Sequence, residues 1–324
     1  MAADIHEQLT KYLTDAHSIE EQALAQLRTA PDIAGDPELA AAFRQHLTET
    51  EGHERITRAL LQGRGASPSK LKDTVMAVGG KGFLLFARLQ PDTPGKLVAH
   101  ALSYEALEVA SYELLLRVAE RAGETEVADA ARRIRDEERE MMRRLEASFD
   151  RSVDASLREV GRSDLQEQLR KYLADAHAIE EQAIALLERA PGMSDDASQL
   201  AATYAEHLDE TREHAELVAE RLQALGGDPS SLKDAALRLG ALNWGAFFQG
   251  HPDTPGKLAA FAYAFEYLEI GAYEQLKRVA ERAGDGETIA VAERILAQER
   301  AAAEKIAAQF DEAAASALAT LGIL

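Results

Sequence analysis

Apolar residues recur at spacings of three and four along four long stretches in each half of the chain, which is the pattern of amphipathic helices. No stretch shows the alternation of apolar and polar residues that a half-buried strand requires. Glycine and proline separate the stretches, and Gly123 stands where a glycine C-cap would end the third. In the first half, the first three predicted helices cover about residues 5–30, 37–63 and 94–123, and the fourth runs from about residue 124 to beyond Phe149.

A long connection joins the second and third predicted helices of each half. In the first half it covers residues 64–93, where glycines and a proline interrupt a segment that still holds an apolar helical stretch. We therefore expect one extra, shorter helix in this connection. Four long helices with one long crossover are typical of ferritin-like bundles, so the pattern predicts an all-α fold of that class.

The chain is a tandem duplication. Three segments of the first half return in the second, offset by 160 residues at the first and 161 at the other two. A period this long corresponds to a whole domain rather than to a solenoid repeat. We predict one four-helix bundle in residues 1–160 and another in residues 163–324, associated as an intrachain pseudo-dimer, with a further homo-oligomer left open. The three pairs are Tyr12–Ala23 with Tyr172–Ala183, Pro91–Leu97 with Pro252–Leu258, and Arg117–Gly123 with Arg278–Gly284.

Composition narrows the functions that these bundles can have. The net charge of −20 argues against a nucleic-acid partner, because phosphate backbones require clustered Lys and Arg. The absence of cysteine excludes disulfides, thiolate nucleophiles, Fe–S clusters and cysteine-ligated zinc. The sequence shows no signal peptide and no apolar run of membrane-spanning length. We therefore expect a soluble, cytoplasmic protein without a membrane partner.

Glutamates occupy the middle of the apolar stripe of every long helix, although on the second stripe the position falls on Glu49 or Thr50. None of the four stripes in the first half carries Lys or Arg. The second half repeats the pattern in register. Burying ionised carboxylates without partners costs several kcal/mol each, against a domain stability of about 5–15 kcal/mol. Such an axis therefore requires protons or a multivalent cation. The glutamates are Glu20, Glu49, Glu105, Glu108 and Glu138 in the first half and Glu180, Glu210, Glu266, Glu269 and Glu299 in the second.

Two histidines lie on the second stripe of each half, His46 and His53 in the first and His207 and His214 in the second. A single glutamate on a helix is usually solvated, and a lone core histidine is usually a structural residue. The combination in both halves favours a metal site instead. Carboxylates with imidazole suit iron or manganese, and the di-iron bundle supplies the precedent.

Four segments of the first half resemble the bacterial YciE/YciF-type stress-associated ferritin-like family. The resemblance covers nearly all of each repeat and is weakest in the long connection. By extension to the wider ferritin and rubrerythrin superfamily, it implies a metal-dependent oxidoreductase of the stress response. The segments are Leu13-Thr-Asp-Ala-His-Ser-Ile-Glu20, His46-Leu-Thr-Glu-Thr-Glu-Gly-His53, Glu105-Ala-Leu-Glu-Val-Ala-Ser-Tyr112 and Glu138-Arg139.

The superfamily resemblance also implies a role for each ligand. Glu20 would be a terminal ligand of the first metal, Glu49 would bridge both metals, and His53 would be the nitrogen ligand. Glu105 and Glu108 resemble the rubrerythrin pair in which one carboxylate bridges and the other moves on and off a metal, and Glu138 would complete the second metal. The second repeat carries these roles on Glu180, Glu210, His214, Glu266, Glu269 and Glu299.

Two departures from the superfamily pattern leave the nuclearity open. The usual spacing is Glu-x-x-His, but His53 stands four residues after Glu49, and His46, three residues before it, competes as ligand or outer partner. The fourth helix has Met141 where the superfamily has a second histidine, as the second repeat has Ala302. His207 repeats the position of His46, while His17 and His177 are expected to support Glu20 and Glu180 from outside.

The resulting hypothesis is a di-iron or di-manganese site in each repeat that reacts with O₂ or peroxide, as a ferroxidase or peroxidase would. Tyr112 and Tyr273, one turn after Glu108 and Glu269, would hydrogen-bond a ligand or donate an electron, or serve only as core aromatics. Without cysteine, a peroxidase cycle needs an external reductant, whereas metal oxidation needs none.

The rival hypothesis is a non-catalytic helical stress protein with a structural or vestigial metal site. It gains support from two apolar segments that would cap the bundles or form a partner surface. These segments are Phe83–Phe86 and Trp244–Phe248.

Overall fold

The computed structural model describes residues 4–66, 93–190, 199–227 and 254–323. Within these ranges the chain is helical and contains no strand, which confirms the all-α prediction. No helix in the described ranges is long and apolar enough to cross a membrane. The chain divides into two compact units, the first reaching Arg158 and the second running from Glu159 to Thr320. Each unit contains one of the two sequence repeats.

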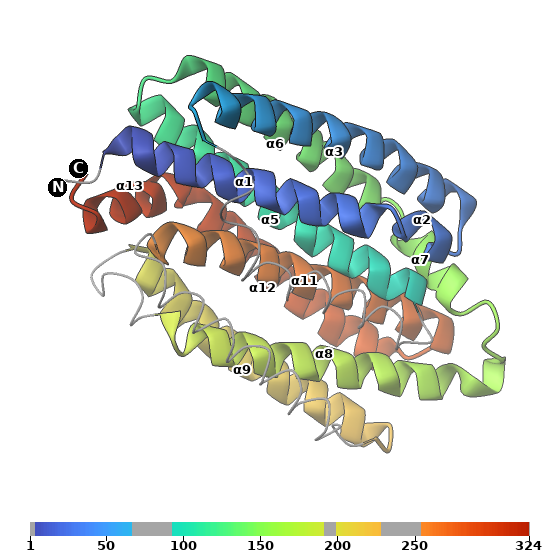
Figure 1. Ribbon diagram of the computed structural model, residues 1–324. Helices are drawn as coiled ribbons and strands as arrows, with labels where there is room; N and C mark the ends of the chain where they lie inside the picture. Colours follow the sequence, from blue (N-terminus) through green and yellow to red (C-terminus); the bar gives the residue numbers. More distant parts are fainter. Residues whose placement is uncertain (1–3, 67–92, 191–198, 228–253, 324) are drawn as a thin grey trace. The chain divides into compact units, whose positions relative to one another are not determined.

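The first unit contains four long helices, together with a short helix after the first and another after the fourth (Figure 1). The long helices are α1 (Ile5–Leu27), α3 (Pro37–Gly63), α5 (Thr93–Arg121) and α6 (Thr125–Glu146), and the short ones are α2 (Ala30–Ile33) and α7 (Phe149–Ser156).

The second unit repeats this arrangement of four long helices. They are α8 (Leu165–Leu187), α9 (Gln199–Ala224), α11 (Thr254–Ala283) and α12 (Gly286–Ala308), preceded by the 3-10 turn η2 (Arg162–Asp164) and followed by α13 (Phe310–Thr320).

Each unit is a four-helix bundle. In the first, α1 packs beside α3 and α5, and α6 packs beside α5 and α3 (Figure 1). In the second, α8 packs beside α9 and α11, and α12 packs beside α11 and α9. The apolar stripes of the four helices meet on the bundle axis and form the core, with side chains such as Leu9, Leu13 and Phe43 almost wholly buried. The polar residues on the same stripes are therefore carried into the core.

Local sequence explains where the helices begin and end. Asp36 caps the start of α3 by accepting hydrogen bonds from the backbone N–H groups of Glu38 and Leu39, and Pro37 is tolerated in the first turn. Gly123 adopts a φ of +72° after α5, as the predicted C-cap requires. The predicted fourth helix ends earlier than expected, because α6 stops at Glu146 and α7 follows as a separate helix.

Some sequence predictions lie outside the described residues. The extra helix expected in each long connection belongs to residues 67–92 and 228–253, and the apolar segments Phe83–Phe86 and Trp244–Phe248 lie in the same ranges.

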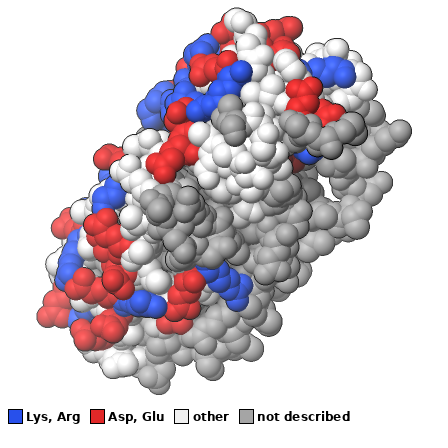
Figure 2. All heavy atoms as spheres, turned by 90° about the vertical axis from the view of Figure 1, so that its left-hand side faces the viewer, with Lys and Arg blue, Asp and Glu red and all other residues white. Residues whose placement is uncertain are grey.

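The surface carries charges of both signs. Figure 2 shows acidic and basic side chains interleaved over the described part of the visible face, rather than separated into patches of one sign. Many surface charges are paired within one helix or between neighbours, as Lys171 is with Glu167 and Arg212 with Glu188. Such exposed pairs contribute little to stability individually.

Replacing Gly35 with alanine is expected to destabilise the first bundle by about 1–3 kcal/mol. Gly35 has a φ of +69° before α3, and an added Cβ would lie 2.8 Å from Cγ of Pro94. Gly63→Ala is the matched control, because a Cβ there meets no described atom within 4 Å and alanine is the better helix former. Urea unfolding should show a lower midpoint for Gly35→Ala only, and equal midpoints for both variants would contradict the expectation.

Candidate metal centre

Helix α3 presents both of its inward histidines on one buried stripe. His46, Thr50, His53 and Thr57 follow one another at spacings of four, three and four, and all four are almost wholly buried. The two threonine hydroxyls donate back to the carbonyl oxygens of His46 and His53 on their own helix, so they need no partner in the core. This stripe directs both imidazoles at the bundle axis.

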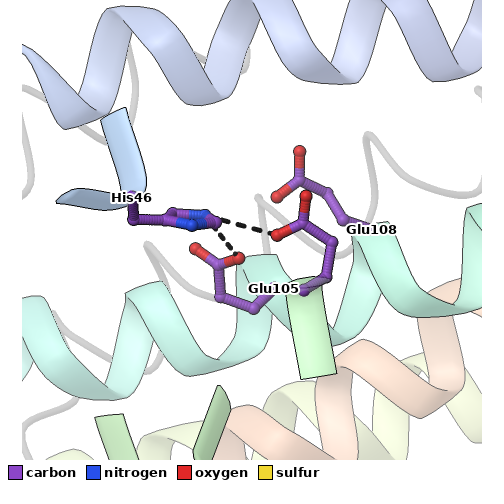
Figure 3. Close-up of side chains that lie close together, drawn as sticks. His46, Glu105 and Glu108 are labelled. Atoms are coloured by element: carbon purple, nitrogen blue, oxygen red, sulfur yellow. Dashed lines mark ion pairs between the residues drawn. The ribbon is translucent and has the colours of Figure 1, made fainter. Parts of the chain in front are cut away.

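His46 lies among three buried carboxylates. Its Nε2 atom is 3.0 Å from Oε2 of Glu105 and 3.3 Å from Oε2 of Glu138. Figure 3 shows His46 on α3 facing Glu105, with the carboxylate of Glu108 beside them on α5. One potential ligand atom from each of these four residues lies within 4.8 Å of the others. We call these four residues the inner group of the first repeat.

A second group adjoins the first and shares one of its members. Nδ1 of His53 is 2.7 Å from Oε1 of Glu138 and 3.7 Å from Oε2 of Glu20. All three residues are buried, and their ligand atoms again lie within 4.8 Å of one another. We call this the outer group. Glu138 directs Oε2 at His46 and Oε1 at His53, so its carboxylate lies between the two groups.

The second repeat builds the same arrangement. His207 takes the place of His46, with its Nε2 atom 3.0 Å from Glu266 and 3.4 Å from Glu299. Nδ1 of His214 is 2.8 Å from Glu299 and 3.8 Å from Glu180. The inner group is His207, Glu266, Glu269 and Glu299, and the outer group is Glu180, His214 and Glu299.

Glu49, expected from the superfamily resemblance to bridge two metals, is in neither group. Its carboxylate is 24% exposed, accepts hydrogen bonds from Gln45 and Arg144, and lies 3.1 Å from Nδ1 of His46. The hydrogen bond from His46 and those from Gln45 and Arg144 lower the pKa of Glu49 to about 2, despite its partial burial. Glu210 has the same position against His207. The buried stripe of α3 includes Thr50, the residue after Glu49, so Glu49 itself lies at the edge of the stripe.

The two tyrosines singled out in the sequence contact the carboxylates of the outer groups. The hydroxyl of Tyr112 donates to Oε1 of Glu20, and that of Tyr273 donates to Glu180. Both rings are buried. In this structure, each tyrosine holds a candidate ligand in place. Met141, at the position where the superfamily has a histidine, is wholly buried in the core.

His17, which the sequence predicts to support Glu20, contacts Glu54. Its Nε2 atom is 2.9 Å from Oε1 of Glu54, which also accepts hydrogen bonds from Arg58. With Glu21 these residues form a further group of potential ligands in the first repeat. The second repeat has Ala215 at the position of Glu54, and there His177 belongs to no such group among the described residues.

Burial and crowding change the protonation of the clusters. Burial, with Glu138 nearby, raises the pKa of Glu20 to about 8, and burial with Glu299 nearby does the same for Glu180. Burial also raises the pKa of Glu108 well above its ordinary range. Burial alone would lower the pKa of His46, but Glu105 and Glu138 raise it well above its usual value. Without a cation, the clusters therefore retain protons that a metal ion would displace.

The donor atoms of these groups could hold a metal ion. Both oxygens of Glu108 are buried and have no hydrogen-bond partner in the described part of the chain, and the same holds for Glu269. Such unpaired buried oxygens carry a large desolvation cost that a cation would offset. Each repeat brings together four carboxylates and two imidazoles, the donor set of di-iron bundles, although both histidines come from one helix.

His53 and His214 each have a second contact, on the ring nitrogen that faces away from the bundle axis, which the sequence pattern does not indicate. Nε2 of His53 is 2.7 Å from Oε2 of Glu137, and Nε2 of His214 is 3.1 Å from Oε1 of Gln298. No periodicity marks these residues, because they precede the buried Glu138 and Glu299 and face the rim. Glu49 and Glu137 also help to line a surface pocket of about 330 Å³ beside α3 and α6.

A four-helix bundle with carboxylates and imidazoles converging on its axis defines a ferritin-like protein, and this chain contains two. The chain belongs to the family described as a domain of unknown function, DUF892, which is the YciF-type ferritin-like family. The family model matches residues 4–158 and again residues 164–319. The resemblance seen in the sequence is thereby confirmed for both repeats. No solved structure gives a significant match.

Proposed function

We propose that each repeat binds a pair of divalent metal ions, one at the inner group and one at the outer group, with Glu138 or Glu299 between them. The observation that supports this most directly is the buried, unpartnered carboxylate of Glu108 and its counterpart Glu269. Four carboxylates balance the charge of two divalent ions, so a loaded bundle axis would be close to neutral. His46 supplies the second imidazole that the fourth helix lacks.

Iron is the metal that this donor set favours, with manganese as the alternative. The activity we propose is oxidation of Fe²⁺ by O₂ or peroxide in the response to oxidative stress. Two Fe²⁺ ions, bound as substrate, each lose one electron, and O₂ takes up both electrons and two protons to give hydrogen peroxide. Ferroxidase chemistry of this kind needs no protein thiol, which agrees with the absence of cysteine.

The protein's own residues would position the ions and control access to them. Tyr112 orients the carboxylate of Glu20, and Glu49 and Glu137 hold the outer nitrogens of His46 and His53. Apolar residues around the axis exclude bulk water and so strengthen the electrostatic interactions of the buried donors. The surface pocket that Glu49 and Glu137 help to line offers small ions a short approach to the two histidines.

Anaerobic titration with Fe²⁺, followed by exposure to oxygen, tests this function. The protein should bind about four ions per chain and consume oxygen in proportion. A variant carrying both Glu108→Gln and Glu269→Gln should lose at least tenfold in the rate of oxygen uptake, because an amide is a poorer ligand for Fe²⁺. Oxygen-electrode traces together with metal analysis give the two readouts.

Glu7→Gln with Glu167→Gln is the matched control, because both glutamates are exposed in the first turns of α1 and α8, lie outside both groups, and should leave the rate unchanged. Binding of iron without oxygen uptake would contradict the catalytic function and favour the structural metal site. Absence of iron binding after anaerobic loading would contradict both.

A further inference from the structure

The two repeats differ in the residue that contacts the second ring nitrogen of the outer histidine, His53 or His214. In both repeats, Nδ1 of the inner histidine faces a glutamate at the edge, Glu49 or Glu210. The outer histidines differ, because His53 has the carboxylate of Glu137 as its partner while His214 has the amide of Gln298. The ligand atoms on the bundle axis are of the same kind in both repeats.

The surrounding contacts make this a difference in charge as well as in atom type. Glu137 uses Oε2 for His53 and Oε1 for Arg133, whose Nε atom is 2.9 Å away. In the second repeat Gln298 is neutral, and the corresponding Arg294 pairs with Glu213 instead. In the part of the chain that the structure describes, a negatively charged acceptor therefore contacts His53 and a neutral one contacts His214.

An acceptor behind a histidine affects how well that histidine binds metal. A hydrogen bond from Nε2–H leaves Nδ1 to face the bundle axis and fixes the orientation of the ring. A carboxylate acceptor also increases the electron density that the ring donates, and it adds attraction for a cation. Loss of such partners typically lowers metal affinity by about 10- to 100-fold.

We propose that Glu137 makes the first repeat the tighter metal site, so that the two bundles of one chain fill in order, the first repeat before the second. Glu137 acts here as a positioning residue through His53. This inference rests on the proposed function in one respect only, that both repeats bind divalent metal. It divides the duplicated bundles into a site that retains metal at low concentration and a site that exchanges it.

Anaerobic titration with Co²⁺, followed by its visible absorption, tests the inference in the full chain. Glu299→Ala disables the second repeat and Glu138→Ala disables the first, so each affinity can be measured alone. The first repeat should bind Co²⁺ at least tenfold more tightly than the second. Glu137→Gln should remove most of this difference, and Gln298→Glu should tighten the second repeat.

A structural role alone would not produce these results together. Gln298→Glu gains affinity, which loss of folding cannot explain, and the Co²⁺ bands of the Glu137→Gln protein should move toward those of the second repeat. Glu140→Gln is the matched control, because Glu140 lines the same pocket and has the same charge but pairs with Arg143. It should leave the affinity within about twofold of the starting value.

The outcomes separate this inference from the function on which it rests. Equal affinities in the two repeats, or an equal loss from Glu140→Gln and Glu137→Gln, would overturn the role of Glu137 and leave the metal sites intact. Absence of Co²⁺ binding in the unmodified chain would overturn both.

Discussion

The protein stripped of metal by a chelator should lose thermal stability as the pH rises from 5 to 9, while the metal-loaded protein should not. The cause is the cluster of buried carboxylates, because the pKa of Glu20 and of Glu180 is raised to about 8 by burial and by a neighbouring glutamate. As the pH approaches 8, these groups ionise inside the core without a cation. Bound metal replaces the protons and removes this penalty.

The direction in which stability changes with pH follows from the difference between the pKa values of the folded and the unfolded chain. A carboxyl whose pKa is 4.5 in the unfolded chain and about 8 in the folded one stabilises the fold below pH 4.5 and loses that contribution as the pH rises through 8. His53 acts in the same direction, because burial alone would lower its pKa but Glu138 and Glu20 raise it to about 9. Glu49, with a pKa of about 2, stabilises the fold above pH 4.5 and loses that contribution only as the pH falls toward 2, so it adds no pH dependence between pH 5 and 9.

The expected loss of stability in the chelated protein is large. One pKa unit corresponds to about 1.4 kcal/mol, so Glu20 alone accounts for up to about 5 kcal/mol, a substantial part of the stability of one bundle. For a repeat of this size, the melting temperature of the chelated protein should fall by roughly 10–20 °C over the range. Circular dichroism melts at several pH values, with chelator and with Mn²⁺, provide the measurement.

Glu20→Gln with Glu180→Gln is the control for the pH effect, because an amide does not ionise and should flatten the slope of the chelated protein. The inference that the clusters are protonated would be contradicted by melting temperatures that change with pH equally with and without metal. It would also be contradicted by a chelated protein that gains stability toward pH 9.

Glu138→Ala should remove both metal ions from the first repeat, whereas Glu105→Ala should remove only one. Glu138 faces His46 with one oxygen and His53 with the other, so both groups lose a ligand with it. Glu105 belongs to the inner group alone. Metal analysis after anaerobic loading should find about four ions per chain in the unmodified protein, three in Glu105→Ala and two in Glu138→Ala.

The second repeat supplies the internal comparison for this count. Glu299→Ala should also leave about two ions, and the variant with both substitutions should bind none. If Glu138→Ala and Glu105→Ala lowered the count equally, Glu138 would not be shared between two ions. A chain that bound one ion per repeat from the start would contradict the paired site.

The sequence was sufficient for the fold and for most of the cluster. Helical periodicity predicts the four long helices, and the duplicated segments predict the repetition, because both depend only on the order of residues along one chain. The same periodicity places Glu20, Glu105 and Glu138 on buried stripes, and the structure has all three in the core. Their burial could be predicted because one apolar stripe per helix must face the bundle axis.

Only the tertiary structure decided which of two nearby residues at the edge of an apolar stripe faces the bundle axis. Glu49 and His46 are three residues apart and lie on adjacent parts of α3, so the spacing allows either to face the axis. Packing against α6 turns Glu49 toward Arg144, 95 residues away, and leaves His46 inside. The partners of His53 and His214 were likewise undetermined, because contacts between helices depend on how the helices pack and not on the periodicity of either one.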